Sequence, residues 1–345
     1  MRTEGLRQIS TKGYNYIFNP TNGFTVRCGD TMEEDPFIGP VPELADISIN
    51  NVCDRGCDFC YKDSSMVGKT MSLEDYRKVL DNLPLTWQLA LGGGEPTLHP
   101  DFIEILKITR EEYDKVPNYT TNGTHLTGKI VAATKAYCGA VAVSYSDRDD
   151  VWIKAAKTFI DCGVKTNIHF VVSEETVQTA MNLLVDLELT PEVLGLEGLN
   201  AVVFLLYKPV GRADKAKTLT VDSAVNFLNY AFSQKGVQVG FDSCFVKHIY
   251  AAEQAGKIEV PWELLDTCES SRFSIYVSED LEVIPCSFGC GSDYTESLRE
   301  NSIKDIWEGE KFSKFREILK KDCYACPMIL KAEQMQRLKE QDVWG

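Results

Sequence analysis

Short apolar runs alternate with amphipathic segments through the middle of this chain. The runs are rich in Val, Ile, Leu and aromatic residues, and the segments between them carry apolar residues at helical spacing. The predicted strands are 46–50, 87–92, 116–121, 140–145, 165–172 and 201–208. The predicted helices between them are 72–83, 101–113, 128–137, 150–161 and 175–187, and Ser72 is the predicted N-cap of the first. This alternation predicts an α/β fold with a parallel sheet, a partial (β/α)6 TIM-like barrel rather than a closed ring of eight strands.

Two smaller regions flank the predicted barrel. Near the N-terminus, residues 14–18 and 24–27 surround Asn-Pro-Thr-Asn-Gly, a pattern typical of a β-hairpin that caps the barrel end. From about residue 221 the pattern changes, and we expect a helix at 221–232, a short strand at 237–241, a helix at 245–254, a hairpin at 273–284 and a last helix at 303–319. The predicted regions are a cap at 1–45, a barrel at 46–235 and a small α+β domain at 236–345.

Composition limits the function. The 345 residues carry a formal charge of −15, which disfavours nucleic acid as a substrate. No apolar stretch is long enough to cross a membrane, so we expect a cytoplasmic protein without membrane contact. Twelve cysteines are many for such a protein, and thiols stay reduced in the cytoplasm. Their spacing therefore has to decide between metal ligation and packing.

The first cysteine group directly follows the first predicted barrel strand. Cys53, Cys57 and Cys60 have the spacing C-x3-C-x2-C. Three thiolates can hold three irons of a [4Fe–4S] cubane and leave the fourth iron open, as a catalytic cluster requires. Zinc is the alternative, but three cysteines without a nearby fourth ligand suit tetrahedral zinc poorly.

With Phe59 before its last cysteine, this loop resembles the radical S-adenosylmethionine (SAM) signature. A second match is the Gly-Gly-Gly-Glu turn that ends the second predicted strand. The resemblance implies that SAM binds the open iron of a catalytic [4Fe–4S] cluster, and that the glycine turn and later strand ends contact SAM. The implied cofactor-binding residues are Phe59, Gly93, Gly94, Glu95, Asn122, Ser144, Asn167 (or His169) and Tyr207.

A second cysteine group lies near the C-terminus. It resembles the auxiliary-cluster domains of radical SAM enzymes that are called SPASM and, in a shortened form, twitch. The resemblance implies one auxiliary [4Fe–4S] cluster, two clusters in total, with the ligands Cys268, Cys286, Cys323 and Cys326. Cys290 is an alternative to Cys286, Cys244 stays open, and a structural zinc site remains the alternative for the whole group.

The implied activity is reductive cleavage of SAM to a 5′-deoxyadenosyl radical, which abstracts a hydrogen atom from the substrate. An auxiliary cluster would then accept an electron and leave the substrate oxidised. An external donor such as flavodoxin or ferredoxin would reduce the catalytic cluster. No catalytic acid or base emerges from the sequence, although His125, His169, Tyr207 and Arg212 lie in suitable places.

Two substrate classes share this architecture by resemblance. The preferred one is a ribosomally made peptide that receives a thioether or carbon–carbon crosslink. The N-terminal hairpin and the acidic surface favour it, because an edge strand and negative charge suit a basic extended leader. The alternative is oxidation of a small polyol or aminocyclitol, favoured by the lack of a winged-helix segment. A remote alternative is a metal-binding protein without enzymatic activity.

Overall fold

The computed structural model describes residues 5–189, 191–260, 266–324 and 326–328. Its largest sheet has ten strands, in the order β10-β9-β8-β7-β6-β5-β4-β11-β12-β13. The barrel strands are β4 (Leu44–Asn50), β5 (Gln88–Gly93), β6 (Val116–Thr121), β7 (Val141–Ser144), β8 (Thr166–Val172), β9 (Ala201–Leu206) and β10 (Val239–Phe241). They pair in parallel, and they include all six strands predicted for the barrel. The predicted α/β partial barrel is therefore confirmed, with β10 as a further parallel strand.

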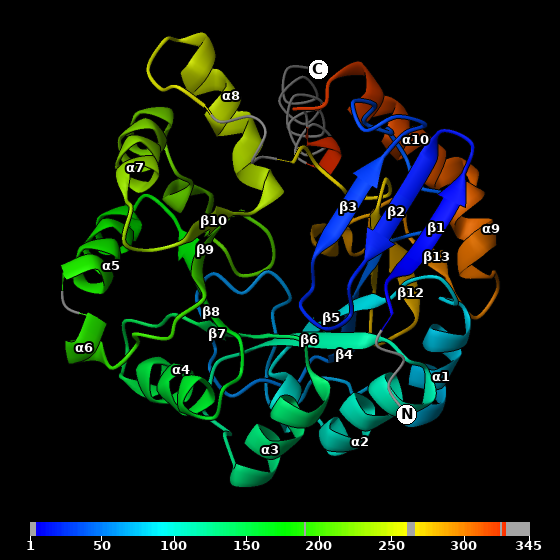
Figure 1. Ribbon diagram of the computed structural model, residues 1–345, viewed down its shortest axis with the longest axis horizontal. Helices are drawn as coiled ribbons and strands as arrows, with labels where there is room; N and C mark the ends of the chain where they lie inside the picture. Colours follow the sequence, from blue (N-terminus) through cyan, green and yellow to red (C-terminus); the bar gives the residue numbers. More distant parts are fainter. Residues whose placement is uncertain (1–4, 190, 261–265, 325, 329–345) are drawn as a thin grey trace, which may run out of the picture.

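Helices cover the outer face of the curved sheet (Figure 1). They are α1 (Leu73–Asp81), α2 (Phe102–Lys107), α3 (Gly128–Tyr137), α4 (Val151–Asp161), α5 (Val177–Leu189), α6 (Pro191–Leu194) and α7 (Val221–Ser233). A π-helical turn at Ile108–Glu112 extends α2. Ser72 caps α1 as predicted, since its Oγ accepts from the Asp75 amide at 3.0 Å.

Alternation along β4 shows how the sheet separates its two faces. Ala45, Ile47 and Ile49 are fully buried in the core between sheet and helices. Asp46 and Ser48 occupy the alternate positions, so their side chains face the barrel interior. The interior of the barrel is therefore polar on this strand, while its outer layer is a continuous apolar core.

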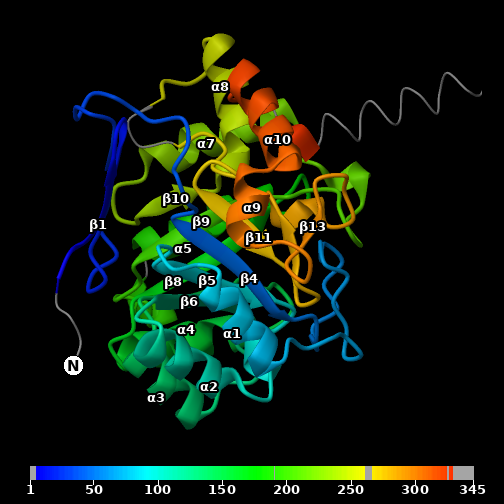
Figure 2. The same ribbon diagram turned by 90° about the vertical axis from the view of Figure 1, so that its right-hand side faces the viewer.

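The C-terminal region continues the barrel sheet. Strand β11 (Ser274–Val277) pairs in parallel with β4, and β12 (Glu282–Ile284) and β13 (Glu296–Ser297) follow in antiparallel order. Helices α9 (Ile303–Glu308) and α10 (Glu310–Lys321) lie beside these strands (Figure 2), whereas α8 (Val246–Gln254) packs against α7. The sheet thus runs through the predicted boundary between barrel and C-terminal domain, whose last residues, 329–345, lie outside the described part.

The helix predicted over 303–319 is two helices. Gly309 is extended between α9 and α10, with φ −72° and ψ 168°. A Cβ at this position would lie 2.9 Å from the Asp305 carbonyl oxygen, so a side chain would crowd the end of α9. Glycine therefore permits the sharp break between the two helices.

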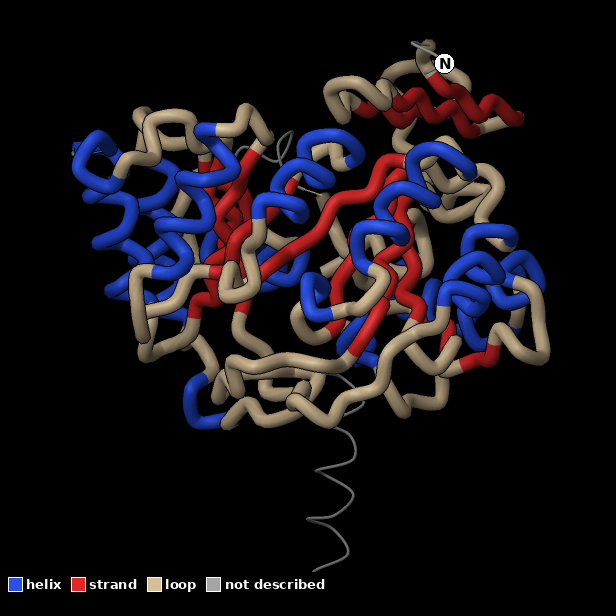
Figure 3. The backbone as a smooth tube through the Cα atoms, turned by 90° about the horizontal axis from the view of Figure 1, so that it is seen from below, coloured by secondary structure: helices blue, strands red, loops and turns tan. Residues whose placement is uncertain are grey.

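The N-terminal cap is a three-stranded sheet of β1 (Arg7–Thr11), β2 (Tyr14–Phe18) and β3 (Thr25–Cys28). It lies across one end of the barrel (Figure 3). Its apolar face contacts Trp87 and Val116 at the starts of β5 and β6, and the Tyr16 and Trp87 rings stack at 5.9 Å. The cap therefore closes the end opposite the cysteine loop.

No helix in the described ranges is both long and apolar enough to span a bilayer.

Candidate functional site

The first cysteine group lies on a loop that leaves the carboxyl end of β4. Backbone hydrogen bonds fold this loop: the Cys53 amide donates to Ser65 O at 3.0 Å, and the Cys60 amide to Cys57 O at 3.2 Å. The Ser64 amide points at Cys60 Sγ, 3.4 Å away. All three cysteines are partly exposed and free of disulfides. The loop thus presents three thiols at the open end of the barrel.

Arginines of the cysteine loop and of neighbouring loops lie around the three thiols. Arg55 forms an ion pair with Asp149 at 2.6 Å, and Arg148 donates to the Arg55 carbonyl oxygen at 2.8 Å. Arg212 donates to Cys57 O at 3.2 Å. Burial raises the pKa of Cys57, while the charges of Arg148, Arg55 and Arg212 act in the opposite direction. These cations favour the thiolate that a metal ligand must be.

The glycine turn after β5 lies directly against the cysteine loop. The Gly94 amide donates to Asn50 O at 2.8 Å, and the Glu95 amide donates to Val52 O at 2.7 Å. A Cβ on Gly93 would lie 1.9 Å from Asn50 O, and one on Gly94 would lie 2.2 Å from Val52 O. Gly93 also has a φ of +116°, which glycine adopts readily. No other residue fits this contact, so the two motifs form one unit.

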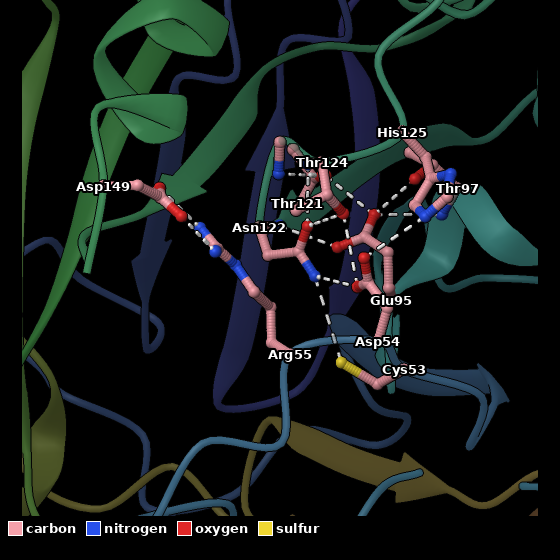
Figure 4. A network of polar contacts seen from close by, with 11 residues as sticks. Cys53, Asp54, Arg55, Glu95, Thr97, Thr121, Asn122, Thr124, His125 and Asp149 are labelled. Carbon is pink, nitrogen blue, oxygen red and sulfur yellow. Dashed lines mark hydrogen bonds and ion pairs between the residues drawn. The ribbon is translucent and has the colours of Figure 1, made fainter. Parts of the chain in front are cut away.

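Glu95 organises the floor of the site (Figure 4). Its side chain is 1% exposed. The carboxylate accepts from Thr97 Oγ1 at 2.6 Å, Thr121 Oγ1 at 2.7 Å and the Asn122 amide at 2.7 Å. Burial raises the pKa of Glu95, and these donors counteract the rise. The carboxylate oxygens are thus engaged by the protein.

Asn122 connects this floor to the cysteine loop. Its Nδ2 donates to Asp54 Oδ1 at 3.1 Å and lies 3.9 Å from Cys53 Sγ. His125 contacts the other oxygen of Asp54 at 3.2 Å. Glu95 fixes the Asn122 backbone, so it acts on the loop through Asn122 (Figure 4).

The remaining predicted cofactor contacts differ in placement. Ser144 ends β7 and lies opposite His169 of β8, on the interior side. Asn167 accepts a hydrogen bond from Asn200 at 2.7 Å. Tyr207 is 4% exposed and donates to Asp214 O at 2.9 Å, so its hydroxyl is engaged in its own loop. Phe59 lies on the cysteine loop and is 40% exposed.

The second cysteine group gathers beside β12. Burial raises the pKa of Cys286 to about 12, and the nearby Cys268 and Cys326 act in the same direction. Cys244, which the sequence left open, is half-buried and close enough to Cys286 to influence it electrostatically. Cys323, a predicted ligand, follows α10 and is partly exposed. The structure therefore brings Cys268, Cys286 and Cys326 together, with Cys244 at their edge.

Across the described residues, no three His, Cys, Asp or Glu side chains are arranged to hold one metal ion. Iron–sulfur cubanes place different demands on a site, because their thiolates bind separate irons. Three thiols on one loop suit a cubane with an open iron. The glycine turn beside them packs directly against the backbone that leads into this loop.

Sequence reasoning missed a polar group between the two cysteine groups. Lys62 Nζ donates to Ser48 Oγ at 2.9 Å, to Tyr276 OH at 2.7 Å and to Glu279 Oε2 at 2.5 Å. Lys62 comes from the cysteine loop, Ser48 from β4, and Tyr276 and Glu279 from the β11–β12 hairpin. The available signal was the polar residues on three inward positions of β4, Asp46, Ser48 and Asn50.

Family models match two separate parts of the chain. Residues 47–146 match the radical SAM superfamily, and residues 268–327 match SPASM, an iron–sulfur cluster-binding domain. Two curated relatives match over part of the chain. A 7,8-dihydro-6-hydroxymethylpterin dimethyltransferase of Methanocaldococcus jannaschii is 33% identical over 89 residues, 24% of this chain and 18% of the relative. A GTP 3′,8-cyclase of Cronobacter sakazakii is 33% identical over 112 residues, 30% of this chain and 34% of the relative. The matches thus span about a third or less of these relatives.

Solved structures share the fold over most of the chain. Streptococcus suis SuiB bound to S-adenosylmethionine superposes with a TM-score of 0.71 at 16% identity, covering 92% of this chain and 90% of SuiB. SuiB bound to the precursor peptide SuiA gives a TM-score of 0.70 at the same identity and coverage. The protein anSMEcpe with AdoMet and the Kp18Cys peptide gives 0.60 at 16% identity, covering 83% of this chain and 84% of that protein.

Proposed function

Because this chain is a radical SAM enzyme that carries a SPASM iron–sulfur domain in its C-terminal region, we propose that it oxidatively modifies a peptide. The product would be a thioether or a carbon–carbon crosslink. The observation that carries the proposal is the shared sheet, in which β11 pairs in parallel with β4 and joins the C-terminal strands to the barrel. Two neighbours of the same fold were solved with peptides, which supports a peptide substrate.

The proposed catalytic site uses both motifs at the open end of the barrel. Cys53, Cys57 and Cys60 would hold a [4Fe–4S] cluster, and a reduced cluster supplies the electron that cleaves SAM to methionine and a 5′-deoxyadenosyl radical. The backbone of Gly93 and Gly94 would face the SAM amino group. Glu95 would position Asn122 beside the cysteine loop. Ser144, Asn167, Tyr207 and Phe59 remain predicted SAM contacts.

The second cysteine group would hold an auxiliary [4Fe–4S] cluster. Cys268, Cys286 and Cys326 are its proposed ligands, with Cys323 as the fourth and Cys244 as the alternative suggested by its place beside Cys286. A second cluster suits an oxidative reaction, because it can accept the electron that a substrate radical loses. Flavodoxin or ferredoxin is the proposed reductant. The twelve cysteines, none in a disulfide, support a reducing cytoplasmic location.

A small-molecule substrate is the second candidate. The curated relatives that match the barrel are named for a pterin and for GTP, both small molecules. Oxidation of a polyol or aminocyclitol would use the same clusters and the same interior. The two candidates differ in what enters the barrel, and they share the first chemical step.

Anaerobic reconstitution with iron and sulfide tests the proposal. We expect about eight irons per chain, and about four in the Cys53/Cys57/Cys60→Ala variant. Dithionite should yield 5′-deoxyadenosine from SAM with wild type and not with this variant. Cys162→Ala is the matched control, since Cys162 lies at the end of α4, away from both groups. Four irons in wild type would remove the auxiliary cluster, and zinc without SAM cleavage would overturn the enzymatic role.

A further inference from the structure

Asp46 is a carboxylate in the middle of β4 that faces the barrel interior. It lies opposite Ala90 of β5 on one side and Tyr276 of β11 on the other. An ideal Cβ on Gly92 would be 3.8 Å from its Oδ1, so the carboxylate points toward the end of the barrel that carries the glycine turn. Asp46 therefore lies inside the barrel, near the junction with the C-terminal strands.

The nearest cation is already neutralised. Lys62 lowers the pKa of Asp46, but its ammonium forms an ion pair with Glu279 at 2.5 Å, in which the two side chains are only 6% and 8% exposed. Lys62 and Glu279 cancel in charge. One negative charge, that of ionised Asp46, remains uncompensated at this junction.

Hydrogen-bond donors near Asp46 are also engaged elsewhere. The Tyr276 hydroxyl accepts from Lys62 and interacts with Cys290, and the Tyr61 hydroxyl interacts with Ser287. Within the described ranges, no side chain and no backbone amide donates to the Asp46 carboxylate. Asp46 is half-buried in the barrel wall, and the described part of the protein supplies no hydrogen-bond donor to its carboxylate.

We propose that Asp46 binds a cationic group of the substrate, an ammonium or a guanidinium, inside the barrel. The inference rests on the proposed function and narrows its substrate to a molecule with an amine or guanidine, for example a peptide with a Lys or Arg side chain. Such a cation would supply the missing charge and the missing donors at once, as a charge-assisted hydrogen bond does.

The electrostatics around Asp46 suit a site that ionises when the ligand arrives. Burial raises its pKa to about 7, so the empty site is about half protonated at neutral pH and avoids an isolated buried charge. The titratable groups that face it are Lys62 and Tyr61 from the cysteine loop and Tyr276, Glu279 and Cys290 from the C-terminal strands and loop. Ala90 and Gly92 on the β5 side are uncharged.

Infrared titration of the reconstituted protein tests this site. The probe is n-butylammonium and the matched neutral molecule is n-butanol. Without a probe, a carboxylic acid band that is absent in Asp46→Asn should titrate near pH 7. Saturating n-butylammonium should lower this pKa by about 1 or more, because an opposite charge within hydrogen-bond distance favours the carboxylate. n-Butanol should leave it unchanged.

Three results would overturn the proposal: no response to n-butylammonium, an equal response to n-butanol, or a responding band that persists in Asp46→Asn. A shift produced by SAM alone, to which n-butylammonium adds nothing, would also overturn it and assign the carboxylate to the cofactor. The comparison of the two probes needs only wild-type protein. SAM cleavage is measured on the same preparation. Its absence would contradict the proposed function, and the Asp46 titration would still decide whether this site binds a cation.

Discussion

Two carboxylates in this protein, Glu95 and Asp46, differ in how the protein compensates their charge. Glu95 accepts hydrogen bonds from Thr97, Thr121 and Asn122, whereas no described residue donates to the carboxylate of Asp46. Burial raises the pKa of both side chains. The protein supplies donors to the carboxylate of Glu95, and we propose that a cationic ligand supplies them to that of Asp46.

Replacing Glu95 by Gln should destabilise the protein by roughly 2–4 kcal/mol. The amide nitrogen of Gln would face donors, which leaves at least one of them buried without an acceptor, and each such loss costs about 1–3 kcal/mol. Urea unfolding of the reconstituted protein measures the change. Glu112→Gln is the control, because Glu112 pairs with Arg77 at the exposed surface and its replacement should change the stability much less. Equal effects of the two variants would contradict the role given to Glu95.

Replacing Asp46 by Asn should change the pH dependence of stability. The folded-state pKa, about 7, lies above the unfolded value near 3.9, so the folded state holds the proton more tightly. The carboxyl group therefore costs stability progressively as pH rises from about 4 to about 7. Asp46→Asn should be more stable than wild type at pH 8, by up to about 4 kcal/mol, and the gain should vanish near pH 4. Unfolding midpoints at several pH values test this, and a constant difference would contradict it.

The contact between two loops decides which residues the glycine turn tolerates. Gly94→Ala places a Cβ against Val52 O, and overpacking of this kind costs about 1–3 kcal/mol. Because the displaced backbone is that of the cysteine loop, iron content after reconstitution should fall too. Gly128→Ala is the matched control, since a Cβ there meets nothing within 4 Å. Normal iron content in Gly94→Ala would show that the two loops are independent.

Elements with local signals could be predicted from the sequence. The barrel strands were found because apolar runs recur between amphipathic helices, and Ser72 was found because capping depends on residues close in sequence. Strand β1 was missed, since Arg7–Thr11 buries only Ile9 against the cap core. The break at Gly309 was missed because a lone glycine is common inside helical patterns.

In the site, too, residues in short local motifs could be predicted, and residues brought together by distant strand pairing could not. The cysteine loop and the glycine turn are short motifs, so their residues could be named in advance. Lys62, Glu279 and Asp46 come together only because β11 pairs with β4 in one particular register, with Tyr276 opposite Asp46. Pairing between strands so distant in sequence leaves no local pattern. The charged residue inside β4 was visible, but its surroundings were not.

At the scale of the molecule, the Lys62–Glu279 pair ties the cysteine loop to the C-terminal strands. Lys62→Met should cost about 3–5 kcal/mol, because it leaves the Glu279 charge buried and unpaired. The double variant Lys62→Met/Glu279→Leu should recover most of this loss. A double-mutant cycle by urea unfolding measures the coupling. The exposed pair Lys157–Asp161 is the control, with an expected effect of about 0.5 kcal/mol or less. Additive effects of the two buried substitutions would contradict the coupling.

The position of β11 has a consequence during biosynthesis. One edge of β4 is covered only when Ser274–Val277 arrive, more than 200 residues after β4 leaves the ribosome. At ordinary translation rates this takes roughly 10–45 s. Throughout that time the nascent barrel exposes an unpaired strand containing Ile47 and Ile49, and such edges promote aggregation. We expect newly made chains to depend on chaperones until this last strand is in place.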